Sequence, residues 1–569
     1  MLIDVLFAIL GITLLKNIFL KNPKNLNLPF SICTIAIATL LFFYITSATA
    51  IANVWLNSHK LTPLIYKIAG LWGNHEGSML LFFTCLTAWS VLLLRKKDSI
   101  RIASFILLLI GSYLYFKANP FVILAIETIT GQDLNPALQN PYLAIHPPIL
   151  YMGQSLCFVL WIWACVEPDN PKIQAYTRVC FGLITLGLIL GSRWAYGELG
   201  WGGFWFWDPV ETVSLFPWLA IIAAVHAKES SRICLLFCFP MVMLGLTLVR
   251  SGVLVSVHSF GFDLHSGIWL GICTILVWAT TFIVFFKCKM VKTSMITLGF
   301  LSCLGVLVTL ILLPILLKYG FGINILIDEL FFHQYITPLA ICLLIFAGLS
   351  PYLKLRNHGW SLFCTILTTS VWCWLMQPHF NMYATFSAVV GFWLIFSTIN
   401  HIKHFFNKGF VSAHIGIGIC ILGASFSENF TQKIEVNLAE LPVKIGNYVV
   451  NFESLKIDET PQVSKEILHF TVNSLNIAPQ RQHFHTSKTI KHQPAWVRIN
   501  FDHIHATAFA SQDNLWKVEL TLKPLISLFW VGLLLVIIGI FVSTVTYFKK
   551  YYQLELLKSS NFAKVQAVV

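Results

Sequence analysis

The chain has 569 residues, of which 57% are hydrophobic and only 11% are charged. Together with a mean hydropathy of +0.75, this composition excludes a soluble globular protein, because so much apolar surface requires lipid as its solvent. The formal net charge of +13 does not indicate nucleic-acid binding, because no polar segment carries a basic stripe with interleaved aromatic residues. The sequence instead predicts an all-α polytopic membrane protein.

Apolar stretches separated by short polar loops recur along almost the whole chain. Each has about 16 to 24 residues and can cross a hydrocarbon core of about 30 Å as a helix. We expect about fifteen transmembrane helices, which begin near Leu2, Phe30, Ser78, Ile100, Pro148, Val179, Val213, Ile233, Ile268, Ser294, Ile336, Gly359, Met382, Phe410 and Leu525. A cleaved signal peptide is not expected, because the first stretch contains Asp4, lacks a basic leader and leads directly into the bundle.

Basic residues give the expected orientation of these helices. Every second loop carries two or more basic residues, which predicts that these loops face the cytoplasm. The basic residues are Lys21/Lys24, Arg95/Lys96/Lys97, Lys172/Arg178, Lys228/Arg232, Lys287/Lys289/Lys292, Lys354/Arg356, Lys403/Lys408 and Lys549/Lys550. The remaining loops then face outward. The predicted organisation is a helical bundle at 1–427 with a special outer loop at 194–212, an outer domain at 428–524, a last transmembrane helix at 525–548 and a cytoplasmic tail at 549–569.

The cysteines do not indicate a disulfide framework. All fourteen lie in or at the ends of predicted spans, and no CxxC motif occurs. Cys234 and Cys238 are one helical turn apart within a span, where packing is favoured over a redox pair.

The segment 428–524 has a different pattern from the rest of the chain. Its apolar and polar residues alternate, as in YVVNFESLKI and WVRINFDHIHATAF, and Asn, Pro, Gly and Ser separate such runs, which is typical of short β-strands. We expect a small outward-facing β domain, inserted before the last helix, that serves as a docking module. His483 alternates with His485, and His503 with His505; an exposed face is favoured over a metal site, because no carboxylate or thiolate completes a ligand set.

Four histidines lie where a polar ring in or near lipid is costly without a partner. His226 lies about thirteen residues into a span that enters from outside, roughly 20 Å deep at 1.5 Å per residue, and His414 lies about four residues into a span that enters from the cytoplasm. Both rings are expected in the inner half of the membrane, where they can share one iron, with an interhelical hydrogen bond as the alternative. His146 and His258 form a second candidate pair at the outer ends of their spans.

The stretch WGGFWFWDPVE at 201–211 gathers aromatic rings on both sides of a Gly-Gly hinge, namely Trp201, Phe204, Trp205, Phe206 and Trp207. Such a cluster can stack on a large planar ring system, each side chain adding about 0.5 to 1.5 kcal/mol beyond its buried area. An anchoring belt at the membrane surface is the alternative. Paired imidazoles and a planar aromatic partner together indicate haem, although the absence of CxxCH excludes covalent haem on this chain itself.

These residues resemble the tryptophan-rich signature of the haem-handling WWD proteins, and specifically of the CcmF-type cytochrome c haem lyases. The resemblance covers nearly the whole chain, with WGNHEGSM at 72–79, NPALQNPYLAIHPPILYMG at 135–153, the signature continued by FPWLAIIAAVH to 226, LVRSGVLVSVHSF at 248–260, AHIGIGICILG at 413–423 and LWKVELTLKPLISLFW before the last helix. The chain departs from the pattern where Phe204 stands in place of the usual Trp and Thr212 in place of the usual Asn. Phe204 keeps a stacking ring but loses the indole N–H donor.

The resemblance implies a haem lyase, which adds the two cysteine thiols of an apocytochrome CxxCH motif across the haem vinyl groups outside the membrane. A haem delivered by a chaperone of the CcmE type is expected between His146 and His258, the catalytic pair, beneath the aromatic signature. A separate haem b is expected between His226 and His414. The other implied partners are apocytochrome c, presenting proteins of the CcmH and CcmI types, and membrane lipid.

Charged residues near His146 and His258 are candidates for supporting roles in haem binding. Arg193, Arg250 and Lys67 are candidate partners for haem propionates, because a cation at the membrane edge orients a carboxylate strongly; helix-end anchoring is the alternative. Asp208 belongs to the same haem-binding segment, and with Glu211 it is expected to cap and shape the next helix rather than to act as an acid or base.

Other functions remain open at this stage. A paralogue dedicated to a special multihaem cytochrome, of the nitrite reductase type, would share all these motifs. A haem exporter would require repeated halves with broken helices, and no internal repeat is found. A purely structural respiratory subunit would leave the aromatic loop and outer histidines without a role. The expected location is a bacterial inner membrane with the active site facing the periplasm, or alternatively a mitochondrial inner membrane.

Overall fold

The computed structural model describes most of the chain, namely residues 2–23, 25–125, 130–200, 203–227, 230–254, 264–289, 291–325, 329–349, 359–375, 382–400, 408–486, 488–510 and 516–566. Two residues of the expected outer site, Trp201 and His258, lie outside the described residues.

Each of the fifteen expected spans coincides with a long helix. These are α1 (Leu2–Phe19), α2 (Asn27–Thr46), α5 (His75–Leu93), α6 (Lys97–Phe116), α7 (Pro141–Val166), α8 (Ile173–Glu198), α9 (Pro209–His226), α10 (Ser231–Arg250), α11 (Leu264–Phe285), α12 (Met295–Phe321), α13 (Glu329–Leu349), α14 (Gly359–Leu375), α15 (Met382–Asn400), α16 (Lys408–Phe430) and α17 (Ile526–Gln566). Short helices α3 (Ala52–Asn57), α4 (Leu64–Gly70) and η1 (Pro136–Leu138) connect some of them.

Eleven of the helices in the described part of the chain are long and apolar enough to cross a membrane. The other four are α1, α13, α14 and α15; the apolar stretches of α13 and α15, Gln334–Ile345 and Ala384–Asn400, are shorter. The prediction of a mostly helical, multipass membrane protein is therefore confirmed.

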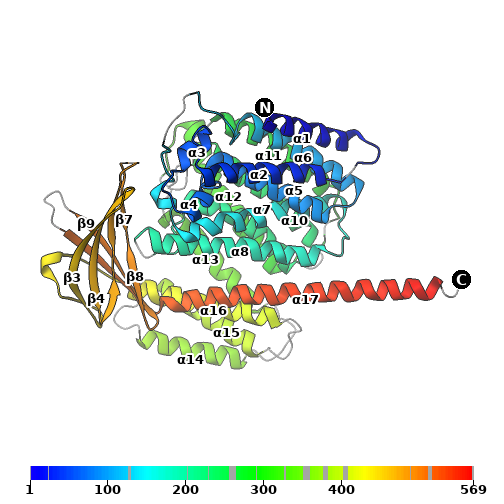
Figure 1. Cartoon of the computed structure of the whole chain (residues 1–569). Coiled ribbons are helices and arrows are strands. Elements are labelled where there is room, and N and C mark those ends of the chain that lie inside the picture. Colours follow the sequence, from blue (N-terminus) through cyan, green and yellow to red (C-terminus); the bar gives the residue numbers. More distant parts are fainter. Residues whose placement is uncertain are drawn as a thin grey trace.

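The helices lie alongside one another, and the strands gather at one end of them (Figure 1). Helices α1 to α13 form one bundle, α16 and α17 run along its side, and α14 and α15 lie beyond them. We call the end that carries the strands the β-domain end and the opposite end the far end. Helix α17 extends past the bundle at the far end, and its 41 residues include most of the tail expected at 549–569.

Side-chain caps set where several helices begin at the β-domain end. Asp208 accepts a hydrogen bond from the Val210 backbone N–H at the start of α9, as its position in the sequence predicts. Asn140 caps α7 in the same way, and Asn74 caps α5. Because each cap satisfies an N–H that the helix itself leaves unpaired, these polar residues fix the first turns that carry the candidate site.

The small β domain before the last helix is confirmed. Its strands are β1 (Gln432–Asn437), β2 (Val443–Ile445), β3 (Tyr448–Glu459), β4 (Val463–Val472), β5 (Leu475–Ile477), β6 (Gln480–Phe484), β7 (Ile490–Gln493), β8 (Ala495–Ile499), β9 (Asp502–Ala510) and β10 (Trp516–Lys523). They form two antiparallel sheets in the orders β1-β10-β9-β8 and β2-β3-β4-β6-β7, with β5 beside β4. Phe470 from one sheet and Ala506 and Leu520 from the other share one buried core.

The expectation that His503 and His505 lie on an exposed face is wrong. Their side chains are 3% and 1% exposed, because β9 packs against the ends of α8 and α17. The Tyr196 hydroxyl of α8 and His503 Nδ1 are hydrogen-bonded at 2.8 Å, and the Tyr196 and His505 ring centres are 4.6 Å apart. These contacts join the β domain to the helical bundle. The alternation of apolar and polar residues could not by itself show which face of β9 would contact the helices.

We expect this contact to weaken in mild acid. Burial, and next the charge of Arg193, lower the pKa of His503 to about 4, and burial, and next the neighbouring His503, lower the pKa of His505 to about 3. Both rings are neutral in the folded protein but titrate near 6.5 when unfolded. The stability they contribute is therefore complete above about pH 6.5 and falls as the pH drops towards 4, by about 2 kcal/mol for one histidine at pH 5.

The measurement is the thermal midpoint of the purified protein between pH 8 and pH 5. His505→Phe removes a titrating ring whose two nitrogens have no hydrogen-bond partner within the described residues, so this variant should be more stable and less sensitive to acid than the wild type. An identical acid dependence of the two proteins would contradict the assignment.

Candidate functional site

The far end of the bundle contains a large cavity between α9 and α16. Its volume is about 920 Å³, and both His226 and His414 line it, within the range of about 300–1,000 Å³ typical of cofactor sites. His226 is the last residue of α9, and His414 lies in the second turn of α16. Most of the remaining lining is apolar, including Ile222, Phe300 and Val536.

The two imidazoles are spaced for a shared metal ion. Their ring centres are 6.3 Å apart, with an angle of 74° between the ring planes. Two imidazoles on opposite sides of one metal ion place their ring centres about 6 Å apart, given metal–nitrogen bonds of about 2 Å and about 1 Å from each nitrogen to its ring centre. The spacing and the apolar lining fit a macrocycle whose iron is held from both sides.

Hydrogen bonds to the backbone select the ring atoms available for ligation. His226 Nδ1 lies 2.9 Å from the Ile222 carbonyl oxygen, and His414 Nδ1 lies 2.9 Å from the Phe410 carbonyl oxygen. A carbonyl only accepts, so each Nδ1 carries the hydrogen and each Nε2 keeps the lone pair that a metal requires.

Close packing of α16 on α17 positions His414. A Cβ atom on Gly532 would lie 2.5 Å from the Cys420 backbone nitrogen, and one on Gly416 would lie 2.7 Å from the Gly532 carbonyl oxygen. The helices can therefore approach this closely only because both positions are glycine. This contact explains Gly416 and Gly423 of the stretch AHIGIGICILG, whereas Gly418 faces α15, where a Cβ atom would lie 2.8 Å from the Gly391 carbonyl oxygen.

The second cavity lies at the β-domain end and has a volume of about 220 Å³. His146 in the second turn of α7 lines it, with Trp205 from the aromatic loop and Arg250 from the end of α10. His146 Nδ1 lies 3.1 Å from the Gly187 carbonyl oxygen, which again leaves the lone pair on Nε2. Gly191 makes room for this ring, since a Cβ atom there would lie 3.2 Å from it.

Arg250 is held by residues of the motif WGNHEGSM at 72–79, to which the sequence alone assigned no role. Its Nη1 donates to His75 Nδ1 at 2.9 Å, and its Nη2 donates to Ser78 Oγ at 2.6 Å. The Nε of Arg250 is buried without a hydrogen-bond partner in the part of the chain that the structure describes. His75, together with Trp72, also lines the cavity; a histidine beside tryptophan at a helix start was the signal that could have identified it.

The aromatic loop does not present its rings as one platform. Trp205 lines the cavity, but Phe204 packs on Phe529 of α17, with ring centres 4.0 Å apart. Trp207 stacks on Phe332 of α13 at 5.3 Å, and Phe206 is 47% exposed. The structure thus brings one of the four described rings into the cavity and uses two others to join neighbouring helices.

The other two proposed propionate partners lie outside the lining of this cavity. The Arg193 guanidinium faces the β domain, 4.3 Å from the Trp496 ring centre and 5.1 Å from that of Trp530. Lys67 donates to Ser47 Oγ at 2.8 Å. Of the three cations, Arg250 alone lines the cavity in the described residues.

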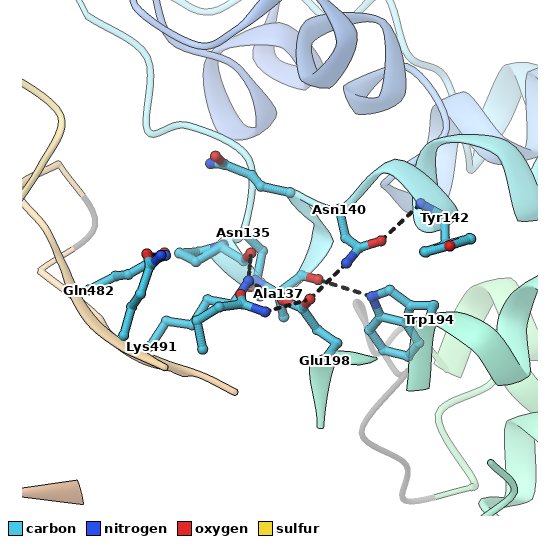
Figure 2. Close-up of polar contacts among 12 residues, drawn as sticks. Asn135, Ala137, Asn140, Tyr142, Trp194, Glu198, Gln482 and Lys491 are labelled. Atoms are coloured by element: carbon cyan, nitrogen blue, oxygen red, sulfur yellow. Dashed lines mark hydrogen bonds and ion pairs between the residues drawn. The ribbon is translucent and has the colours of Figure 1, made fainter. Parts of the chain in front are cut away.

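A buried carboxylate ties the β domain to the helix that carries His146. Glu198 at the end of α8 pairs with Lys491 of β7 and accepts a hydrogen bond from the Asn140 side chain at 2.8 Å. Figure 2 shows these residues converging from the β domain, α8 and the loop before α7, with Lys491 also donating to the Pro136 carbonyl oxygen at 2.9 Å. Because Asn140 also caps α7, the position of the β domain and the first turn of α7 are linked.

The two cavities lie at opposite ends of α9. Glu211 lines the cavity at the β-domain end, and His226 lines the one at the far end. Fifteen residues of helix separate them, or about 22 Å at 1.5 Å per residue. One macrocycle cannot reach from one histidine site to the other.

Comparisons with known proteins show which proteins the chain is similar to. A family model described as Cytochrome C assembly protein matches residues 72–168 and 169–254. The cytochrome c-type biogenesis protein CycK of Rhizobium meliloti is 30% identical over 514 residues, covering 78% of this chain and 76% of CycK. The cytochrome c-type biogenesis protein CcmF of Haemophilus influenzae is 27% identical, covering 91% of this chain and 92% of that protein.

A solved structure titled Cytochrome c Heme Lyase CcmF has the same fold, with a TM-score of 0.78 over 95% of this chain and 96% of that chain, at 17% identity. Because the CycK alignment reaches 30% identity over more than three quarters of both proteins, the chain belongs to the cytochrome c-type biogenesis family that includes CycK and CcmF, as its motifs predict.

Proposed function

We propose that this protein is a cytochrome c haem lyase, which attaches haem to the CxxCH cysteines of apocytochrome c. Each thiol S–H adds across one haem vinyl C=C bond, forming one C–S and one C–H bond, so the attachment needs no oxidant. The observation that carries the proposal is the β-domain-end cavity, where an imidazole, an indole ring and a guanidinium converge in His146, Trp205 and Arg250.

These groups suit the binding and orientation of a substrate haem. The His146 imidazole would hold the iron, with His258 as its expected counterpart from the sequence. Trp205 would stack on the ring, and Arg250, whose Nε is buried without a partner among the described groups, would pair with a propionate carboxylate. Fixing the vinyl groups in place converts the thiol additions into steps between positioned reactants.

The far-end cavity suits a resident haem b between His226 and His414. Such a haem supplies one-electron chemistry when bound. Its separation from the β-domain-end cavity, about 22 Å along α9, means that the two histidine pairs would serve different haems.

The orientation follows from the basic loops and the β domain. Residues such as Lys172, Arg232 and Lys408 lie at the far end of their helices, which we assign to the cytoplasm. The β domain and the His146 cavity then face the periplasm of a bacterial inner membrane, where a haem chaperone of the CcmE type and apocytochrome-presenting proteins of the CcmH and CcmI types would meet it.

The test is deletion of the gene in the host that encodes it, followed by complementation. A single-haem reporter with a CxxCH motif should lose covalent haem, measured by peroxidase stain after denaturing electrophoresis, and regain it with the wild-type gene. Loss confined to a multihaem reporter whose attachment motif ends in Lys would favour the dedicated paralogue. Normal covalent haem on both reporters would overturn the proposal.

A further inference from the structure

The far-end cavity contains a buried cation that its two histidines do not explain. Arg178, in the second turn of α8, is 6% exposed and lines the cavity with His226 and His414. Its Nη1 donates to the Gln174 backbone oxygen at 2.8 Å and to the Gln174 side-chain oxygen at 3.0 Å. No carboxylate of the described residues pairs with it, and its Nε has no hydrogen-bond partner among them.

A guanidinium without an anion at this depth is costly. Removing a charge from water requires compensating charge or hydrogen bonds, and an intramembrane arginine normally faces a partner or a polar cavity. Tyr547 of α17 provides part of the compensation, since its ring centre lies 3.4 Å from the guanidinium carbon. An aromatic face holds the guanidinium in place but leaves its remaining donor groups available for an anion.

The lining of the cavity changes along α17 from apolar to polar. Val536, Gly539 and Ile540 come first, and Ser543, Thr546, Tyr547 and Lys550 follow towards the far end. From Val536 to Lys550 the helix rises about 21 Å. The cavity therefore has an apolar interior near the middle of the bundle and a rim at the far end with two cations, Arg178 and Lys550.

We propose that Arg178, with Lys550 in the lining of the same cavity, binds the propionate carboxylates of the haem held by His226 and His414. This rests on the haem b of the proposed function. A haem has an apolar edge and a propionate edge, and the cavity offers an apolar interior and a cationic rim in the matching order. The fork of N–H donors on Arg178 suits a carboxylate, and Tyr547 is the positioning residue that orients it.

The experiment compares two ligands that differ only at the propionates. The purified protein, stripped of haem in detergent, is titrated with iron protoporphyrin IX and with its dimethyl ester, and binding is followed by the low-spin absorption spectrum. The wild type should bind the diacid at least about tenfold more tightly than the diester, since a hydrogen bond to a charged group contributes about 1.5–3 kcal/mol. Equal affinity for the two ligands would overturn the proposal.

Variants assign this preference to Arg178. Arg178→Gln should lower the affinity for the diacid about tenfold and leave the diester unaffected, and Arg178→Lys should retain part of the preference. Arg232→Gln is the matched control, because Arg232 lies in the first turn of α10 and donates to the Ala164 carbonyl oxygen at 2.9 Å without lining the cavity.

Other outcomes contradict the proposal in distinguishable ways. An equal loss of both ligands in Arg178→Gln would show a structural role only. If Arg178→Gln kept the wild-type ratio of affinities for the diacid and the diester but lost co-purified phosphatidylglycerol, Arg178 would bind a lipid headgroup instead. A wild type that gives no low-spin spectrum with either ligand would overturn the inner haem itself, and the propionate assignment with it.

Discussion

Replacing His226 or His414 with alanine should abolish the low-spin b-type spectrum of the purified protein. The two ring centres lie 6.3 Å apart across a cavity of about 920 Å³, so both imidazoles would hold the haem, and the loss of either would remove one of its two protein ligands. We expect at least a hundredfold loss of low-spin haem in the single variants and its absence from the double variant, measured by reduced-minus-oxidised absorption per mole of protein.

The control is His469→Ala, which changes a histidine of strand β4 that lines neither cavity. Each variant should be present in the membrane at the wild-type level, because replacing a side chain that lines a cavity should not prevent the protein from folding. An unchanged spectrum in the double variant would sink the assignment of this cavity as a haem site.

Replacing His146 with alanine should block covalent haem attachment while the inner b-type spectrum persists. His146 lines the β-domain-end cavity, and about 22 Å of α9 separates that cavity from His226. We expect at least a hundredfold decrease in covalent haem on a reporter cytochrome, by peroxidase stain. The sequence predicts the same result for His258→Ala.

A milder variant tests the position of the ring rather than its presence. A Cβ atom at residue 191 would lie 3.2 Å from His146 Nδ1, so Gly191→Ala should displace the imidazole by a few tenths of an ångström and reduce attachment several-fold. Loss of both the covalent product and the inner spectrum from every single substitution, in folded protein, would show that the two sites are not independent.

Hydropathy and the position of residues along each span were sufficient to predict the helices and the proximity of His226 to His414. A span must satisfy all its backbone hydrogen bonds within lipid, so long apolar stretches become helices wherever they lie in the fold. Counting residues at 1.5 Å each predicted that His226 and His414 lie at similar depth, and the structure places their ring centres 6.3 Å apart. Alternation of apolar and polar residues likewise identified the β domain.

Contacts between distant segments could not be predicted in this way. The burial of His503 and His505 depends on β9 packing against α8 and α17, which lie about 300 and 20 residues away in the sequence. The division of the aromatic loop depends on partners such as Phe529 and Phe332, whose proximity no local pattern encodes. For Arg178, the basic loop indicated only a cytoplasmic anchor.

The sequence by itself thus determined the membrane class, the helices and the β domain, because these depend on local composition and helical rise. Only the tertiary structure decided which rings line a cavity, which cations face it and which polar groups remain without a partner. The physical reason is that burial and pairing depend on side chains from other helices, and those neighbours are set by packing rather than by position along the chain.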